Sequence, residues 1–363
     1  AVENGLNKVE LGDGRVGVIT ASISYQYAKE VFPEGTSFLK LGLTYPLPMK
    51  LIRDFAAKVE KLYVIEELEP FMEDQIKAAG IPCVGKELTG LLYELNTQLL
   101  RQRVLGQKAD YRTVDVAPAN RPPALCPGCP HRGFFYTLSK NKNYVVTGDI
   151  GCYTLGALPP LSAMDTTVDM GASVSMAHGF ELALAGTEHR PIVAVIGDST
   201  FAHSGLSSLI STVYNRGAGT VCVLDNRTTA MTGRQGNPFN GVTLQNRPSR
   251  ELNIEAVVAA LGVEDVRVVD PNDAAAVRRA LKEATGSDDI SVIVFRSPCV
   301  LLERHVEPPL FVSGSCTACG ACVTLGCPAL GREETGRALI DPALCIGCGH
   351  CTQYCRFDAI VQE

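Results

Sequence analysis

The 363-residue sequence lacks the features of several broad protein classes. No apolar run approaches the roughly 18 residues of a transmembrane helix, which argues against a membrane span. Asp and Glu outnumber Lys and Arg, and the net charge of −6 argues against a nucleic-acid partner. No basic stretch followed by an apolar core opens the chain, so we expect no secretory leader and a cytoplasmic location. Because the chain begins with Ala1 rather than Met, we expect a processed chain or part of a longer polypeptide.

Cysteine, by contrast, is abundant. Fourteen cysteines in a chain without a secretion signal predict metal or cluster ligation in a reducing compartment rather than disulfides. The fold class that we predict is α/β, because strand and helix patterns alternate along most of the chain. We expect two parallel-sheet α/β domains, 1–112 and 113–308, and a ferredoxin-like α+β module at 309–363. A proline-rich stretch, 113–130, predicts a linker between the two α/β domains.

The segment from Pro191 to Gln235 predicts a βαβ unit. Ile192–Ile196 and Val221–Leu224 read as buried strands, and a helix lies between them. Four apolar residues are expected to share one face of that helix: Leu206, Leu209, Ile210 and Val213. A right-handed crossover brings Asp198 and Asn226, which follow the two strands, to the same edge of the sheet.

Asp198 and Asn226 offer two hard oxygens, the ligands that Mg²⁺ prefers beside phosphate oxygens. Gly197 would let a diphosphate approach the backbone, and the helix amino end after Ser199 presents free N–H groups to an anion. This strand-GD-helix-strand-N pattern resembles the diphosphate-binding motif of thiamine diphosphate enzymes. The alternative is an ordinary βαβ unit whose Asp and Asn cap turns.

A second candidate segment precedes this unit. Residues 165–185 predict a glycine-containing turn and a helix, where Gly171, Ala172 and Ser173 would allow a planar ring or a phosphate to approach closely. His203, directly after the diphosphate turn, and His131 are the catalytic candidates. The acidic run at 66–69 reads as a solvated strand end.

Four further cysteines lie in turns or just beyond predicted strands: Cys126, Cys129, Cys152 and Cys299. We expect them to converge at one sheet edge and to hold a proximal [4Fe–4S] cluster. Zinc ligation and buried unligated thiols are the alternatives.

The last 55 residues carry two runs of cysteines with ferredoxin spacing. Because the fourth cysteine of each run ligates the other run's cluster, two sets are predicted: Cys316, Cys319, Cys322 and Cys355, and Cys345, Cys348, Cys351 and Cys327. The first run has four residues before its last cysteine, and Arg356 stands where proline is usual. Cys83 and Cys222 are left as core thiols.

Taken together, these motifs resemble the 2-oxoacid:ferredoxin oxidoreductase family, in particular the α subunits of its indolepyruvate branch. The matching stretches are CPGCPHRG, GDIGCYTLG, DTTVDMGASVSMAHG, GDSTFAHSG, LDNRTTAMTGRQ, SPC and the paired cluster motifs, with LGLTYPLPMKLIRDF and EKLYVIEELEPF in the first domain. The four-residue gap in the first cluster motif is typical of this family.

The resemblance implies thiamine diphosphate, held through Mg²⁺ by Asp198, Asn226 and the main-chain carbonyl of Thr228. The loop carrying Thr232, Gly233 and Gln235 would fold over the cofactor. Electrons would pass through the proximal cluster and the two terminal clusters to external ferredoxin, and coenzyme A would take the acyl group. Family α subunits have a further amino-terminal domain that binds the pyrimidine ring, so another chain or domain would complete the site beside a β/γ-type subunit.

Other readings stay open at this point. The substrate could be an aryl 2-oxoacid of the indolepyruvate type, pyruvate or a branched-chain 2-oxoacid. A non-oxidative thiamine-dependent decarboxylase would leave the clusters without a role. An electron-transfer subunit would use its α/β part only to dock to partners.

Overall fold

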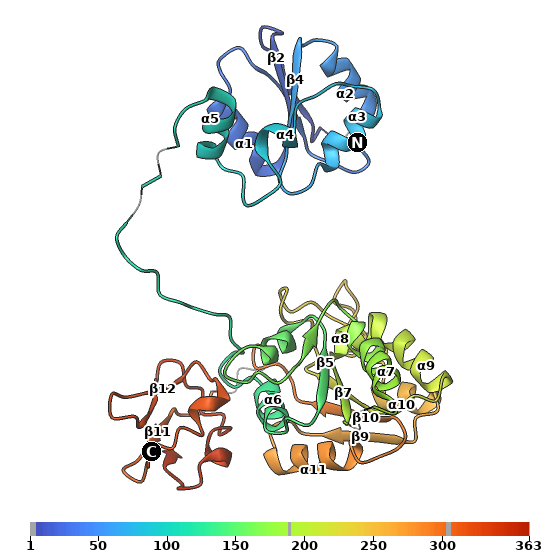
Figure 1. The fold of residues 1–363 in the computed structure, drawn as a ribbon, viewed down its shortest axis with the longest axis vertical. Coiled ribbons are helices and arrows are strands. Elements are labelled where there is room, and N and C mark those ends of the chain that lie inside the picture. The colour runs from blue at the N-terminus through green and yellow to red at the C-terminus, as the bar shows by residue number, and fades with distance from the viewer. Residues whose placement is uncertain (1–4, 110, 113, 188–189, 303–305, 363) are drawn as a thin grey trace. The chain divides into compact units, whose positions relative to one another are not determined.

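The protein was analysed as a computed structural model, in which the chain forms two compact units, Ala1–Ala119 and Asn120–Glu363 (Figure 1). The structure describes residues 5–109, 111–112, 114–187, 190–302 and 306–362. Within these ranges no helix has both the length and the apolar character to cross a membrane. The described part of the predicted linker contains no helix or strand before α6 begins at His131.

The first unit is a four-stranded sheet in the order β1-β3-β2-β4, with apolar cores on both faces. Strands β2 (Val16–Ala21), β3 (Ser37–Leu41) and β4 (Lys61–Ile65) are parallel, as the sequence predicts. Strand β1 (Lys8–Glu10) adds an antiparallel edge that the prediction missed, because three residues are too short to show alternation. The helices are α1 (Ser22–Val31), α2 (Met49–Ala56), α3 (Phe71–Ala78), α4 (Lys86–Thr89) and α5 (Thr97–Leu105).

Two predictions for this unit are wrong. Helix α2 ends at Ala56 rather than Leu62, since Leu62 is a buried residue of β4 whose apolar side chain also fits a helical period. Glu66 is not solvated: it is 8% exposed and accepts hydrogen bonds from the N–H groups of Met72 (2.8 Å) and Glu73 (2.9 Å) at the start of α3.

The second unit contains a fully parallel six-stranded sheet in the order β6-β5-β7-β8-β10-β9. Val193 and Val195 of β7 face a core that includes α6 and α11, whereas Ala194 and Ile196 face α7, α9 and α10. The strands are β5 (Val145–Gly148), β6 (Thr166–Thr167), β7 (Ile192–Gly197), β8 (Thr220–Asp225), β9 (Asp265–Val269) and β10 (Ser291–Arg296). The helices are α6 (His131–Ser139), α7 (Ala172–Leu184), α8 (Asp198–Thr200), α9 (Leu206–Tyr214), α10 (Ile254–Ala260) and α11 (Ala274–Ala284), with a 3₁₀ turn η1 (Cys152–Ala157) and a π turn η2 (Phe201–Gly205).

Strand order reverses between β5 and β7, and this is the edge where open α/β sheets bind ligands. After β7 the chain is helical without a break from Asp198 through η2 to Tyr214. Leu209 of α9 is buried as predicted, but Ile210 is 50% exposed, so the predicted apolar face is too wide.

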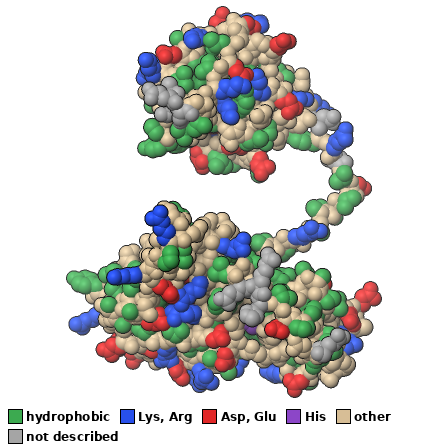
Figure 2. All heavy atoms as spheres, turned by 180° about the vertical axis from the view of Figure 1, so that it is seen from behind, with side chains coloured by type: hydrophobic (Ala, Val, Ile, Leu, Met, Phe, Trp, Pro, Cys, Tyr) green, Lys and Arg blue, Asp and Glu red, His purple; other side chains and the backbone are tan. Residues whose placement is uncertain are grey.

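The C-terminal module is built from two antiparallel strand pairs, β11 (Leu310–Val312) with β14 (Ile360–Gln362) and β12 (Leu330–Arg332) with β13 (Ala338–Ile340). Its described helical turns, η3 (Val323–Leu325) and η4 (Thr352–Tyr354), are short 3₁₀ turns. Leu325 and Ile340 share one core with Phe134 and Phe135 of α6, so the module packs directly on the α/β domain. Charged side chains of both signs are mixed with hydrophobic ones over the face of this unit in Figure 2.

Candidate active site

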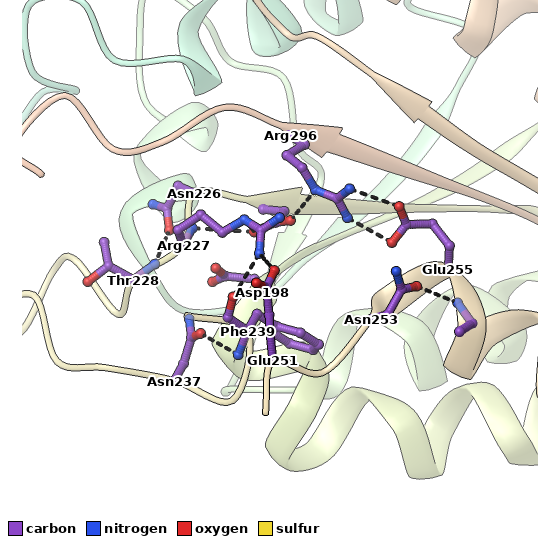
Figure 3. Close-up of polar contacts among 12 residues, drawn as sticks. Asp198, Asn226, Arg227, Thr228, Asn237, Phe239, Glu251, Asn253, Glu255 and Arg296 are labelled. Carbon is purple, nitrogen blue, oxygen red and sulfur yellow. Dashed lines mark hydrogen bonds and ion pairs between the residues drawn. The ribbon is translucent and has the colours of Figure 1, made fainter. Parts of the chain in front are cut away.

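Asp198 occupies the first helical position after β7, where its carboxylate is 2% exposed. Its Oδ1 accepts a hydrogen bond from the Ser199 N–H at 2.6 Å. Its Oδ2 is buried without a hydrogen-bond partner among the described residues. In Figure 3 the Asp198 side chain lies between the turn of Asn226 and Thr228 and the side chain of Asn237. An unpartnered buried carboxylate oxygen is the feature that a cation would satisfy.

Burial, and after it the neighbouring charge of Asp225, raise the pKa of the Asp198 carboxyl to about 7. A divalent cation would offset both effects, so the residues fit the Mg²⁺ that the sequence predicts. Among the described residues no three His, Cys, Asp or Glu side chains are grouped to hold an ion. An ion here would therefore need amide, main-chain and phosphate oxygens beside Asp198, which is the usual shell of a phosphate-bound Mg²⁺.

Asn226 directly follows β8, and its side chain has two polar contacts. Its Oδ1 accepts from the Thr228 N–H at 3.2 Å, and its Nδ2 lies 3.3 Å from His131 Nε2. The intervening Arg227 adopts a left-handed backbone (φ +65°), and its guanidinium donates to the Phe239 carbonyl at 2.7 Å and pairs with Glu251. This turn places the Asn226 and Thr228 oxygens at the same edge as Asp198 (Figure 3).

A partly buried ion-pair network lies behind the turn. Asp225 is fully buried, and its Oδ2 lies 2.7 Å from Arg296 Nε. The other two nitrogens of Arg296 donate to Glu255 at 2.7 and 2.8 Å (Figure 3). Because Arg296 joins the ends of β8 and β10 to α10, the position of Asn226 is fixed by the sheet.

The predicted cofactor loop folds on itself. Thr232 Oγ1 donates to Gln235 Oε1 at 2.7 Å, and Gln235 Nε2 donates back to the Thr232 carbonyl at 2.8 Å. Gly233 between them has a φ of +125°, and all three residues are exposed. The loop is tied to the site by the neighbouring Thr229, whose Oγ1 donates to Ser199 Oγ at 2.8 Å.

Asp149 is a residue that the sequence reasoning missed. It follows β5, is fully buried, and accepts hydrogen bonds from Ser173 Oγ (2.8 Å), the Gly171 N–H (3.1 Å) and the Tyr153 hydroxyl. Burial raises the pKa of its carboxyl. The signal was present in the sequence, since Gly-Asp ends both β5 and β7.

The predicted glycines are packing positions in this structure. A Cβ on Gly171, whose φ is +97°, would collide with Ser204 Oγ, so α7 and the π turn approach closely here. A Cβ on Gly197 would lie 2.6 Å from the Tyr153 ring, so the absence of a side chain at Gly197 makes room for Tyr153. Ala172 and Ser173 begin α7, and Ser173 is bound to Asp149 as described above.

The two candidate histidines differ. His131 is 3% exposed, and burial lowers its pKa to about 4, so the ring is neutral at pH 7. Its Nε2 contacts the side-chain amide of Asn226, one of the candidate cation ligands. His203 is an exposed residue of η2, and no hydrogen bond among the described residues links it to the site. The structure therefore brings only His131 into contact with the candidate cation ligands.

The four proximal cysteines lie near enough to influence one another electrostatically, although in the described part of the chain no three of them are grouped closely enough to hold a single ion. The negative charges of ionised Cys126 and Cys152 raise the pKa of Cys129, and those of Cys299 and Cys126 raise the pKa of Cys152. Burial is the main reason that the pKa of Cys129 rises to about 12 and that of Cys152 to about 11. The Cys299 N–H donates to the Asn226 carbonyl at 3.0 Å, so this cysteine site adjoins the candidate cation site.

Two further cavities each hold four cysteines, in the sets that the sequence predicts. The outer cysteine cavity is lined by Cys316, Cys319, Cys322 and Cys355. The inner cysteine cavity is lined by Cys327, Cys345, Cys348 and Cys351, together with Pro127, Gly128 and Arg132 of the CPGC segment. Cys83 is half-buried and Cys222 fully buried, and burial raises the pKa of both thiols.

Arg132 joins the proximal cysteines to the inner cysteine cavity. It is 2% exposed, and its guanidinium donates to the carbonyls of Leu125 (2.5 Å), Cys126 (2.9 Å) and Leu325 (2.9 Å). Gly128 packs against Ile346 so closely that a Cβ would overlap that side chain. The proximal cysteines, the inner cysteine cavity and the Asp198 site are therefore contiguous within this unit.

Comparison with known proteins gives family matches for two parts of the chain. Residues 149–295 match the thiamine pyrophosphate enzyme, C-terminal TPP binding domain, and residues 338–361 match the 4Fe-4S binding domain. The chain is 40% identical over 96% of its length to the indolepyruvate oxidoreductase subunit IorA of Thermococcus kodakarensis, covering 60% of that relative. It is 36% identical over 98% of its length to the same subunit of Archaeoglobus fulgidus, covering 61%.

Among solved structures, a 2-oxoglutarate:ferredoxin oxidoreductase from Magnetococcus marinus aligns with a TM-score of 0.44 and 16% identity, over 50% of this chain and 66% of that one. The chain spans about 60% of the length of the curated relatives that it matches. The resemblance inferred from the motifs and the predicted fold class are confirmed.

Proposed function

We propose that this homologue of the indolepyruvate oxidoreductase subunit IorA provides the thiamine diphosphate site and the iron–sulfur clusters of a ferredoxin-dependent 2-oxoacid oxidoreductase. The reaction is the oxidative decarboxylation of an aryl 2-oxoacid with coenzyme A, which yields an aryl-acetyl-CoA, CO₂ and two electrons for ferredoxin. The preference for an aryl substrate of the indolepyruvate type is taken from the names of the relatives.

One observation carries the proposal: the candidate cation site and a four-cysteine site share a residue. Asn226 contributes its side chain to the first and accepts the Cys299 N–H at 3.0 Å beside the second. A non-oxidative decarboxylase has no use for electron carriers at this position. An oxidoreductase needs a carrier directly beside the reacting carbon, because electrons must leave the site one at a time.

The residues of the chain can be given roles on this basis. Thiamine diphosphate, when bound, supplies the electron sink for cleavage of the bond to CO₂. Asp198 Oδ2, Asn226 Oδ1 and the Thr228 carbonyl would hold the Mg²⁺. The contact of His131 with Asn226 Nδ2 would hold the amide in place, so that Oδ1, which accepts the Thr228 N–H, could bind the ion through its second lone pair. Segment Gly171–Ser173 and loop Thr232–Gln235 would contact the cofactor, and His203 stays a candidate for substrate contact.

The chain would act with partners. Because it spans about 60% of its relatives, another segment or chain would supply the pyrimidine-binding half of the thiamine site. A β/γ-type subunit and external ferredoxin complete the proposed assembly, which we place in the cytoplasm. We propose three [4Fe–4S] clusters: one at the proximal cysteines and one in each of the two cysteine cavities.

Metal and cofactor content test this proposal. The chain, co-purified without oxygen with its partners, should contain about twelve irons, four for each cluster, and one thiamine diphosphate. Cys126→Ser should lower the iron content to about eight while the terminal clusters keep their visible absorption. Asp198→Ala should lose thiamine diphosphate and keep its iron.

Three results would contradict parts of the proposal. Equal thiamine diphosphate binding by Asp198→Ala and the parent would refute the cofactor site. An unchanged iron content in Cys126→Ser would refute the proximal cluster. Decarboxylation of an aryl 2-oxoacid without reduction of viologen or ferredoxin would identify a plain decarboxylase.

A further inference from the structure

A basic cavity of about 430 Å³ lies between α6, α11 and the C-terminal module. We call it the basic cavity; it is lined by Tyr136, Thr137, Lys140, Asn141, Tyr144, Arg278, Leu281, Lys282 and Tyr354. No Asp or Glu is among these residues. Lys140, Arg278 and Lys282 are exposed, and in the described part of the chain none of them forms an ion pair.

The acidic residues around the basic cavity are engaged elsewhere. Glu283, next to Lys282, pairs with Arg267 at 2.5 Å. Asp273 accepts from the N–H groups of Ala275 and Ala276 at the start of α11. The positive charge of the basic cavity is therefore not neutralised locally, although the whole chain has a net charge of −6.

Tyr354 forms the wall between the basic cavity and the outer cysteine cavity, because it lines both. It directly precedes the predicted cluster ligand Cys355. Its ring lies 4.3 Å from that of Tyr136, and Lys140 Nζ lies 4.2 Å from the centroid of the Tyr136 ring. One aromatic side chain thus separates a cysteine set from a positively charged hollow that is open to solvent.

The inner cysteine cavity, by contrast, shares no lining residue with the basic cavity. It is lined by Pro127, Gly128 and Arg132 of the proximal cysteine segment. The order along the unit is therefore proximal cysteines, inner cysteine cavity, outer cysteine cavity and basic cavity. The last of these is where a carrier can approach the end of the series.

We infer that the basic cavity is the docking surface for the external electron carrier, a small acidic iron–sulfur protein. The inference rests on the proposed function, and it adds the place of docking and the cluster from which electrons leave. An acidic carrier is attracted to Lys140, Arg278 and Lys282 and repelled by the negative charge of the rest of the chain, which orients the encounter.

The electron transfer balances without a proton. One electron would leave a cluster held at the outer cysteine cavity, oxidising it, and would reduce one iron–sulfur centre of the carrier; no bond forms or breaks. Two such one-electron transfers would follow the oxidation of each 2-oxoacid.

The test compares the anaerobically purified complex of the full chain and its partners with the double variant Arg278→Glu/Lys282→Glu. Binding of an oxidised, acidic two-[4Fe–4S] ferredoxin is measured at low and high salt, so this readout needs no turnover. We expect the Kd and the KM for ferredoxin to rise about tenfold, and the salt dependence of binding to fall. Reduction of methyl viologen, which needs no docking surface, should be unchanged.

Arg216→Glu is the control for a charge reversal away from the basic cavity, to be compared with the single variant Lys282→Glu. Arg216 is also an exposed cation, but it follows α9 on the opposite face of the sheet, so its reversal should leave ferredoxin binding as in the parent. Carbodiimide coupling gives an independent readout: ferredoxin carboxylates should cross-link to Lys140 or Lys282 in the parent.

The outcomes separate the two proposals. A ferredoxin Kd within twofold of the parent in the double variant, or an equal loss in Arg216→Glu, overturns the docking surface. A raised KM for coenzyme A with unchanged ferredoxin binding also overturns it and identifies a small-anion site. If the parent reduces neither viologen nor ferredoxin, the proposed function fails, while the binding measurement still decides the docking surface.

Discussion

Replacing Asp198 by Asn should stabilise the metal-free protein and abolish its response to Mg²⁺. The carboxylate is buried, its Oδ2 has no partner among the described residues, and Asp225 is nearby. Asn keeps an oxygen that can accept the Ser199 N–H but carries no charge. The substitution therefore removes a buried charge without emptying the site.

The magnitude follows from the pKa of Asp198, which is raised from 3.8 to about 7. At 1.36 kcal/mol per pKa unit this corresponds to about 4 kcal/mol of penalty on the charged form. Since the folded protein binds the extra proton between about pH 4 and 7, the stability of the parent falls as pH rises through that window and is constant above it. The advantage of Asp198→Asn should therefore be near zero at pH 4 and reach about 4 kcal/mol, or about 10 °C in Tm, above pH 7.

Thermal unfolding followed by circular dichroism, without oxygen and from pH 5 to 8, measures this effect in Mg²⁺-free buffer. Adding Mg²⁺ and thiamine diphosphate should raise the Tm of the parent above pH 7 but not that of Asp198→Asn, because a cation binds the deprotonated carboxylate. The reasoning is refuted if Asp198→Asn melts below the parent at pH 8 without metal, or if Mg²⁺ stabilises both proteins equally.

Three further substitutions test the packing around the sites by thermal unfolding. Arg132→Gln removes donors from three carbonyls and should cost about 3 kcal/mol; a Tm equal to that of the parent would show that these hydrogen bonds contribute nothing. Gly171→Ala places a methyl group against Ser204 at a φ of +97° and should cost about 2 kcal/mol, only partly recovered in a double variant with Ser204→Ala. Glu66→Gln weakens the cap of α3 and should cost about 1 kcal/mol, a loss absent if the cap is dispensable.

The sequence was sufficient to predict the strands that carry the site. Ile192–Ile196 and Val221–Leu224 are unbroken apolar runs bounded by glycine or polar residues, and they form the buried strands β7 and β8. Because parallel strands end at one edge, the meeting of Asp198 and Asn226 followed from the topology. The cysteine sets were predictable because ferredoxin spacing fixes which thiols face one another.

Tertiary contacts decided what the sequence could not show. Whether Glu66 is solvated depends on where α3 begins relative to the end of β4, and no local pattern encodes that distance. Position 197 has no room for a side chain because the Tyr153 ring packs against it, and Tyr153 lies 44 positions earlier in the chain. The basic cavity joins α6, α11 and Tyr354, which are far apart in sequence, so its charge appears only after folding.

The core that Leu325 and Ile340 share with Phe134 and Phe135 has a consequence for the evolution of this chain. A ferredoxin that folds as a separate domain could be exchanged between enzymes as a unit. This module, however, packs against α6 and buries part of its apolar face. Removing the module would expose the apolar face of α6, which begins at His131. The CPGC cysteines directly precede this helix, so their positions would be disturbed as well. In evolution, loss of the C-terminal module would therefore also disturb the proximal cysteines.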